Sequence, residues 1–310
     1  MSRARGPKKV HQITNPRYLS YYHGYVEWLT TLGYSESVIY NMPSYLREFF
    51  TYLEARSIEY IGEAPEGIVR DFAAYLRVRK KLNSSGTLSN TSINSRLYAV
   101  DKLSDYLIKE HGIFLPVTVG KLPENNKPKT ILTIAEVERL YKVLDSDYLG
   151  IRDRAMLGLF YGCGLRSKEG RSLDVKDVQL HRNLIYIRKA KNYHQRLVPM
   201  TDQIRNDLEN YLLYSRPYLS RKQPNQRSFL VSYRSHRPCA SGLSHRLRDL
   251  TKRSGISEYK PRVTLHSLRH SIATHLLQKG MKLDDIRQFL GHLSLNSTQV
   301  YTHILHELEA

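Results

Sequence analysis

The C-terminal part of the chain carries side chains of the kinds that bind a phosphate and attack it. They comprise three imidazoles, one guanidinium and one phenol: His266, Arg269, His270, His292 and Tyr301. A helix over 265–279 would place the first three on one face, because residues three and four apart are surface neighbours. Arginine matches phosphate oxygens two at a time, and a tyrosine hydroxyl can act as a covalent nucleophile. The spacing therefore predicts chemistry at a phosphate.

Two further cations precede this group and are weaker signals when taken singly. Arg166 follows two glycines at the end of an apolar run, and Lys191 lies between two strand-like runs. A loop carried by a rigid scaffold often places functional groups. An isolated arginine, however, is more often an ion-paired surface residue, and an isolated hairpin lysine is usually only solvated. Both are candidates because of the C-terminal group that accompanies them.

The composition indicates an anionic partner. The 310 residues include 48 Lys and Arg against 29 Asp and Glu, which gives a net charge of +19. Such an excess favours nucleic acid or an anionic membrane surface and does not bear on the fold. No apolar run is long enough to span a membrane, no signal peptide is recognisable, and two cysteines do not suggest a disulfide framework. We expect a cytoplasmic protein.

The apolar pattern divides the chain into two domains. In the N-terminal third, apolar residues recur at helical spacing in four stretches, which predicts a helical domain over 15–118 behind a short basic tail at 1–14. Residues 119–132 contain glycine, proline and asparagine and are predicted to be a linker. The second domain, 133–310, opens with a capping box between Thr133 and Glu136.

The second domain is predicted to be mostly helical with one small hairpin. Its strongest strand signals are the runs Leu184–Ile187 and Arg196–Pro199. The fold class is therefore mainly α with a small β hairpin or sheet. Gly170 stands within the helix expected after Arg166, where glycine costs about 1 kcal/mol relative to alanine. We expect this helix to be short or unusually closely packed.

A strongly basic helix is predicted within residues 216–262. Leu243, Leu247 and Leu250 form its apolar stripe, which predicts one face packed against a core. The remaining surface carries a set of cations that could contact nucleic-acid phosphates: Arg246, Arg248, Lys252 and Arg253. The alternative interpretation is a solvated charged surface without a partner.

Four groups of residues together resemble one protein family. They are Gly164-Leu165-Arg166 with Glu169; Lys191 with Arg196-Leu197-Val198-Pro199; His266-Ser267-Leu268-Arg269-His270; and Leu290-Gly291-His292 through Tyr301-Thr302-His303. In these the chain resembles the tyrosine recombinases, or phage-type integrases, most closely the Xer-type members. The resemblance implies a helical, SAM-like core DNA-binding domain at 15–118 and a mostly helical catalytic domain at 133–310. It also implies a catalytic set of Arg166, Lys191, His266, Arg269, His292 and Tyr301, supported by Glu169 and His270.

Elementary chemistry suggests a role for each member of this implied set. A phosphodiester gathers charge on its nonbridging oxygens in the transition state, so two permanently charged arginines are suited to stabilise it. Tyrosine has a reference pKa near 10 and needs a proton acceptor, for which His266 is the candidate. Lys191 is the candidate acid for the leaving oxygen, and His292 would donate a hydrogen bond to the phosphate. The resemblance implies a 3′-phosphotyrosine intermediate that needs no ATP, metal or other cofactor.

Three alternatives to this hypothesis use part of the same set of residues. His266 and His270 have the spacing of a helical zinc motif, but Ser267 stands where that motif needs its glutamate, so we expect no metal. A type IB topoisomerase would use the same phosphotyrosine step without recombination. A catalytically silent DNA-binding protein of this fold would not need six catalytic groups.

The resemblance also implies the partners. These are double-stranded DNA with paired recombination sites and further copies of the chain, as a dimer on each site and a tetramer in the synapse, with or without a second recombinase. Integration, excision, inversion and dimer resolution are all compatible with the sequence. Ile304 and Leu308 share a helical face in the short tail after Tyr301. We expect this tail to dock on an adjacent protomer.

Overall fold

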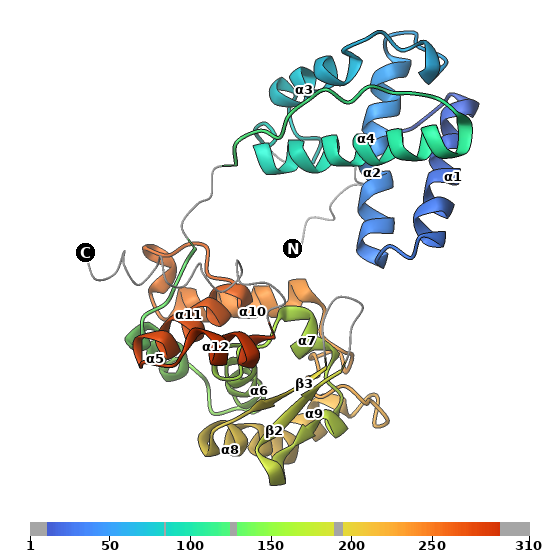
Figure 1. The fold of residues 1–310 in the computed structure, drawn as a ribbon. Helices are drawn as coiled ribbons and strands as arrows, with labels where there is room; N and C mark the ends of the chain where they lie inside the picture. The colour runs from blue at the N-terminus through green and yellow to red at the C-terminus, as the bar shows by residue number, and fades with distance from the viewer. Residues whose placement is uncertain (1–10, 84, 125–128, 189–194, 292–310) are drawn as a thin grey trace, which may run out of the picture. The chain divides into compact units, whose positions relative to one another are not determined.

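The chain folds into two compact units, Met1–Lys127 and Pro128–Ala310. The computed structural model, drawn in Figure 1, describes residues 11–83, 85–124, 129–188 and 195–291. Three of the predicted site residues lie outside these ranges: Lys191, His292 and Tyr301.

In its described part, the first unit contains four α-helices and a short 3₁₀ helix. They are α1 (Pro16–Thr31), α2 (Glu36–Glu54), η1 (Ile61–Glu63), α3 (Ile68–Val78) and α4 (Asn90–His111). The side chain of Asn15 caps α1 and that of Ser89 caps α4 by accepting backbone hydrogen bonds. The helical expectation for this part of the chain is confirmed, with α4 the longest helix.

The core of the first unit is rich in aromatic side chains. Tyr18 and Phe50 are fully buried and stack with ring centroids 5.1 Å apart, which joins α1 to α2. Glu48 is 2% exposed and accepts hydrogen bonds from Arg79 and Arg96, each with a nitrogen 2.7 Å from one carboxylate oxygen. A buried carboxylate is tolerated when it is paired in this way. The ion pairs connect α2 to α4 and to the residue that follows α3.

The described part of the second unit is mostly helical. Its helices are α5 (Ile134–Lys142), α6 (Tyr148–Leu157), α7 (Ser167–Ser172), α8 (Asp202–Asn210), α9 (Arg216–Ser220), α10 (Ala240–Arg253), α11 (Leu265–Gln278) and α12 (Leu283–Leu290). Two π-helical segments continue α6 and α8: Gly158–Gly162 and Tyr211–Ser215. The predicted capping box between Thr133 and Glu136 opens α5. No described helix of either unit is both long and apolar enough to span a membrane.

A small antiparallel sheet follows α7 in the second unit. Its strands are β1 (Val178–Gln179), β2 (Leu184–Ile187) and β3 (Arg196–Pro199), in the order β1-β2-β3. The register pairs Leu184 with Pro199 and Ile187 with Arg196. The two predicted strands are therefore confirmed at their predicted bounds. Strand β1 was not predicted, because it is too short to show an alternating pattern.

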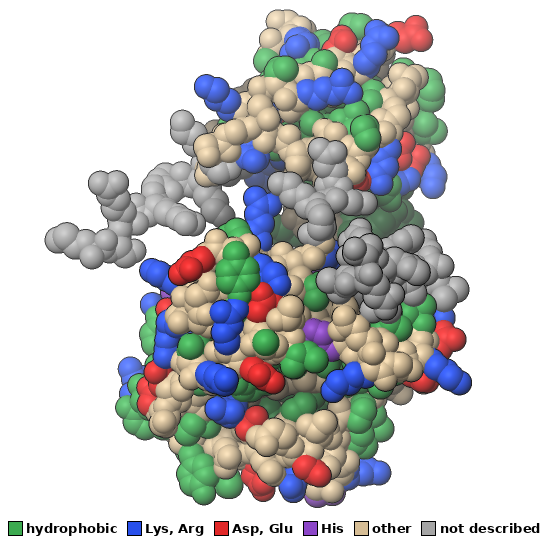
Figure 2. All heavy atoms as spheres, turned by 90° about the vertical axis from the view of Figure 1, so that its left-hand side faces the viewer, with side chains coloured by type: hydrophobic (Ala, Val, Ile, Leu, Met, Phe, Trp, Pro, Cys, Tyr) green, Lys and Arg blue, Asp and Glu red, His purple; other side chains and the backbone are tan. Residues whose placement is uncertain are grey.

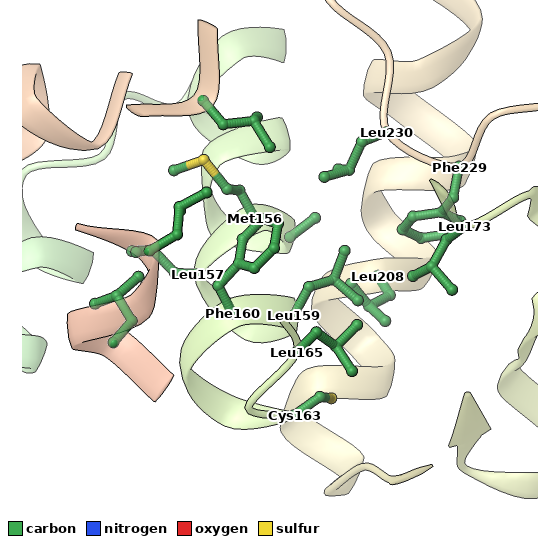
Figure 3. Packing of buried hydrophobic residues seen from close by; sticks show 14 of the residues in the cluster. Met156, Leu157, Leu159, Phe160, Cys163, Leu165, Leu173, Leu208, Phe229 and Leu230 are labelled. Carbon is green, nitrogen blue, oxygen red and sulfur yellow. The ribbon is translucent and has the colours of Figure 1, made fainter. Parts of the chain in front are cut away.

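The core of the second unit forms around α6 and its π-helical continuation. Figure 3 shows side chains such as Met156 and Phe160 packed in a cluster with Leu208 of α8 and Phe229. The helix after Arg166 is short, as expected, because α7 contains only six residues. A Cβ atom on Gly170 would lie 2.5 Å from Cε1 of Phe160. The glycine is therefore needed for close packing between α7 and this core.

Candidate active site

Glu169 is the centre of a cluster of arginines in the second unit. Its carboxylate accepts hydrogen bonds from the Arg166 backbone at 2.8 Å and from the Arg166 guanidinium at 3.0 Å. Arg196 of β3 binds the same carboxylate through two nitrogens, at 2.9 and 3.0 Å. Arg269 of α11 has a nitrogen 3.8 Å from Glu169. The fold thus joins three arginines, from three separate segments, through one carboxylate.

Arg269 is among the largest fully buried side chains of the described chain. It is 1% exposed and donates hydrogen bonds to the carbonyl oxygens of Gly164 and Leu290, both at 2.6 Å. A buried guanidinium must be paired and hydrogen bonded, because an isolated buried charge is very costly. These contacts hold the α11 arginine beside the turn that leads into Arg166.

The same arginines cap the C-terminal end of α12. Arg196 donates to the carbonyl of Phe289 at 3.3 Å, and Arg269 to that of Leu290 at 2.6 Å. Arg166 donates to the carbonyl of Gly291 at 2.9 Å. The last carbonyls of a helix lack partners within it, and cations near that end interact favourably with its dipole. The cluster therefore holds the backbone at the residues that immediately precede His292.

Two glycines allow the backbone to approach this cluster. Gly164 and Gly291 have φ angles of +57° and +66°, in the left-handed region that favours glycine. A Cβ atom on Gly291 would lie 2.8 Å from Nη1 of Arg196, and one on Gly164 would lie 2.8 Å from Cδ2 of Leu290. Side chains at these positions would push α12 and the arginines apart.

The electrostatics of the cluster keep Glu169 ionised. Burial of the carboxyl group would raise its pKa, but hydrogen bonds from Arg196 and the charges of Arg196 and Arg166 outweigh burial and lower the pKa to about 2. Glu169 therefore stays negative over the whole physiological range. It can orient two guanidinium groups without exchanging a proton with them.

His266 lies on α11 next to the buried arginine. It is exposed, and its ring centroid is 4.3 Å from that of the buried His270. Desolvation by neighbouring atoms, followed by the charges of Arg269, Lys129 and Arg166, lowers the pKa of His266. A lowered pKa favours the neutral imidazole at neutral pH, which is the form that accepts a proton. The helix predicted over 265–279 is observed as α11, and Arg269, His266 and His270 lie together on it.

His275, further along α11, has a structural position. It is 5% exposed, and its Nδ1 lies 3.0 Å from the hydroxyl of Tyr161 in the π-helical segment before Arg166. This contact joins α11 to the segment that carries the first arginine. Among the described residues, no group of three His, Cys, Asp or Glu side chains is arranged to hold a metal ion.

Both ends of the hairpin that carries Lys191 are held by arginine–carboxylate pairs. At the end of β2, Arg188 donates through Nε to both oxygens of Asp177, at 3.0 and 2.9 Å, and lies 2.7 Å from Asp174. At the start of β3, Arg196 binds Glu169 as described above. Lys191 itself is outside the described residues, so its assignment remains a prediction.

The four predicted DNA contacts on α10 fall into two groups. Arg246 pairs with Asp153 and Asp249, and Arg253 pairs with Asp145 at 2.7 Å. The side chains of Arg248 and Lys252 are exposed, and within the described ranges neither forms an ion pair. On the face drawn in Figure 2, Lys and Arg side chains likewise lie among Asp and Glu side chains. Arg248 and Lys252 are therefore the cations of α10 that are most available to a partner.

Arg196 stands within one of the sequence motifs, but no role was predicted for it. The signal available was its place just after the Lys191 loop, in Arg196-Leu197-Val198-Pro199. That position did not show which carboxylate it would meet. The structure places it in the arginine cluster with 10% of its side chain exposed.

Comparison with known proteins identifies the family. The model of the phage integrase family matches residues 130–307 of the chain. The chain belongs to the phage integrase family. It is 30% identical over 305 residues to tyrosine recombinase XerC 2 of Ralstonia nicotianae, covering 96% of this chain and 86% of that protein. It is 32% identical over 291 residues to tyrosine recombinase XerC of Bacillus subtilis, covering 92% and 91%.

Solved structures agree with this membership at the level of the fold. A crystal structure of the XerH site-specific recombinase bound to a palindromic difH substrate has a TM-score of 0.73 to this chain. The two share 19% sequence identity, and the match covers 99% of this chain and 98% of that one. The relatives that are 30% and 32% identical show that the chain is a tyrosine recombinase, and the resemblance stated from its motifs is confirmed.

Proposed function

We propose that this tyrosine recombinase exchanges strands between two double-stranded DNA sites through a phosphotyrosine formed on Tyr301. The cluster of Arg166 and Arg269 on Glu169 is the observation that carries the proposal. Two guanidiniums from distant parts of the chain lie together, and both bind the end of α12, from which the chain continues to His292. A site of this kind suits the charge that develops on a phosphate in its transition state.

The proposed step breaks one bond and forms one. The Tyr301 oxygen attacks the scissile phosphorus, His266 accepts the phenolic proton, and the bond from phosphorus to the 5′ oxygen breaks. Lys191 gives a proton to that oxygen, so that a 5′ hydroxyl is released. His292 donates a hydrogen bond to the phosphate. Attack by the 5′ hydroxyl of another strand reverses the step, and bond energy is conserved because the phosphodiester is replaced by a phosphotyrosine ester.

The domain and assembly proposals follow from the same function. Residues 15–118 are proposed as a core DNA-binding domain and residues 133–310 as the catalytic domain, joined by 119–132. Solved relatives support a DNA partner, since XerH was crystallised with its difH substrate. We propose a dimer on each DNA site and a tetramer in the synapse, with the tail after Tyr301 docked on an adjacent copy.

Strand exchange between two differently labelled duplexes tests the function directly. The sites are first recovered from the host's genomic DNA by mapping the covalent adduct. We expect recombinant duplexes that contain one end from each parent, formed without ATP or divalent metal. Relaxation of supercoiled DNA with no recombinant product would instead indicate topoisomerase chemistry. Site binding without either reaction would indicate a silent DNA-binding protein.

The salt dependence of binding tests the proposed DNA contacts on α10. Each phosphate contact that is lost should reduce the slope of log affinity against log salt by roughly 0.9. The double variant Arg248→Ala/Lys252→Ala is therefore expected to reduce it by roughly 1.8. Arg246→Ala/Arg253→Ala should change it less, because carboxylates already neutralise both arginines. Affinity is measured by fluorescence anisotropy. An unchanged slope for Arg248→Ala/Lys252→Ala would indicate that the basic face of α10 is a solvated surface that does not contact DNA.

A further inference from the structure

Arg196 belongs to the arginine cluster, but the proposed chemistry gives it no task. It is on β3, and its side chain is 10% exposed. Its two terminal nitrogens bind the two oxygens of Glu169 at 2.9 and 3.0 Å, and its Nε donates to the carbonyl of Phe289 at 3.3 Å. All three nitrogens of the Arg196 guanidinium therefore bind either Glu169, which supports Arg166, or the end of α12.

We propose that Arg196 is a positioning residue that keeps Arg166 and Arg269 aligned for the scissile phosphate and leaves the cluster with a net positive charge. The inference rests on the proposed function. It extends that function to a residue that would not touch the DNA. Arg196 would act through Glu169 and through the backbone at Phe289 and Gly291.

The charge of Arg196 explains why a carboxylate can support this site. Glu169 alone would cancel most of the positive charge of Arg166, which the phosphate needs. With Arg196 bound to the same carboxylate, the cluster has three positive charges and one negative charge, which leaves two net positive charges. Glu169 can then orient Arg166 through two hydrogen bonds without neutralising the phosphate site.

The shape of the guanidinium explains how Arg196 can also contact the end of α12. A planar fork can bind a carboxylate with two parallel hydrogen bonds while its third nitrogen points elsewhere, and a lysine cannot do this. Here the third nitrogen reaches the end of α12, and Gly291 leaves the space: a Cβ there would lie 2.8 Å from Nη1 of Arg196. Arg196 therefore sets the distance between Glu169 and the end of α12, where Arg166 and Arg269 bind the neighbouring carbonyls of Gly291 and Leu290.

The test compares cleavage of two substrates under single-turnover conditions with the full-length protein. One carries an ordinary scissile phosphate, and the other carries a neutral methylphosphonate in which a methyl group replaces one nonbridging oxygen. Cleavage of the neutral substrate gathers less negative charge, so it depends less on the arginines. Arg196→Gln and Arg196→Lys are compared with Arg166→Ala. Arg152→Gln is the matched control, because Arg152 pairs with Asp153 at 2.8 Å and is 12% exposed but lies outside the cluster.

We expect Arg196→Gln to bind a half-site normally but to cleave the phosphate on the order of 100-fold more slowly, as misplacement of a catalytic group does. Arg196→Lys should recover only part of the rate. On the methylphosphonate, the defect of Arg196→Gln should shrink by roughly tenfold or more, in parallel with Arg166→Ala. Arg152→Gln should show no substrate-dependent difference.

Three results would overturn the inference, and one of them concerns the proposed function. Equal defects of Arg196→Gln on both substrates would show that the residue only stabilises the fold. A defect relieved by a 5′-thio leaving group, and not by the methylphosphonate, would show that it acts through the Lys191 loop. If Arg166→Ala itself gave equal defects on both substrates, the role proposed for Arg166 would fail first.

Discussion

Replacing Tyr301 by phenylalanine should abolish the covalent protein–DNA adduct while leaving DNA binding unchanged. Phenylalanine keeps the aromatic ring and removes only the hydroxyl that would attack the phosphorus. The substrate is a nicked duplex that carries the correct site. After cleavage a strand fragment diffuses away, so the strand cannot be rejoined and the adduct is trapped. Denaturing electrophoresis detects the protein–DNA species, and an electrophoretic mobility shift on the intact site reports affinity.

The control for this experiment is another tyrosine of the second unit. Tyr233 is 66% exposed, and Tyr233→Phe should form the adduct at the wild-type level. An adduct formed by Tyr301→Phe would contradict the assignment of the nucleophile. Peptide mapping of that adduct would then identify the residue that attacks. Tyr301 lies outside the described residues, so its assignment is a prediction that this experiment tests.

Much of the fold could be predicted from local patterns. Leu184–Ile187 and Arg196–Pro199 are strands at the predicted bounds, because alternating and β-branched residues flank a polar loop. The capping box at Thr133 and the helix that carries Arg269 were also predicted, since both depend on residues close in sequence. These signals involve at most one turn of helix or one pair of strands.

The arrangement of the site depended on contacts that no local pattern contains. Arg166 reaches the carbonyl of Gly291, which is 125 residues away, and Arg196 reaches a carboxylate 27 residues away. A single sequence with many arginines does not show which of them will meet Glu169. The chemistry of the motifs predicted that Arg166 and Arg269 act together. Tertiary packing was needed to show that they cap α12 and share their carboxylate with Arg196.

The same reasoning separates the cations of α10. From the sequence, Arg246, Arg248, Lys252 and Arg253 were equivalent members of one basic face. The structure distinguishes them because Asp153 and Asp145 come from other segments and pair with the two arginines Arg246 and Arg253. A charge count therefore overestimates the number of cations available to DNA. The salt-slope measurement on Arg248 and Lys252 is designed around this difference.

Replacing Lys191 by alanine should slow cleavage by roughly 100- to 10,000-fold, the range typical of losing a general acid. The reason is the leaving oxygen, which departs as a basic alkoxide unless a proton is supplied. A substrate with sulfur at the 5′ bridging position leaves as a thiolate that needs no proton. Lys191→Ala should therefore recover much of its rate on the 5′-thio substrate, measured by single-turnover cleavage.

The neighbouring Lys189 provides the matched control for this prediction, since it lies on the same loop and carries the same charge. If Lys191 is the acid, the rate of Lys189→Ala relative to the wild type should be similar on the oxygen and sulfur substrates. If Lys189 is the acid, Lys189→Ala should instead be the variant whose rate recovers on the sulfur substrate. Equal defects of Lys191→Ala on the oxygen and sulfur substrates would assign it an electrostatic role. Arg188 and Arg196 hold the two ends of this loop through Asp177 and Glu169. Either lysine would therefore act from a loop whose two ends are fixed by ion pairs.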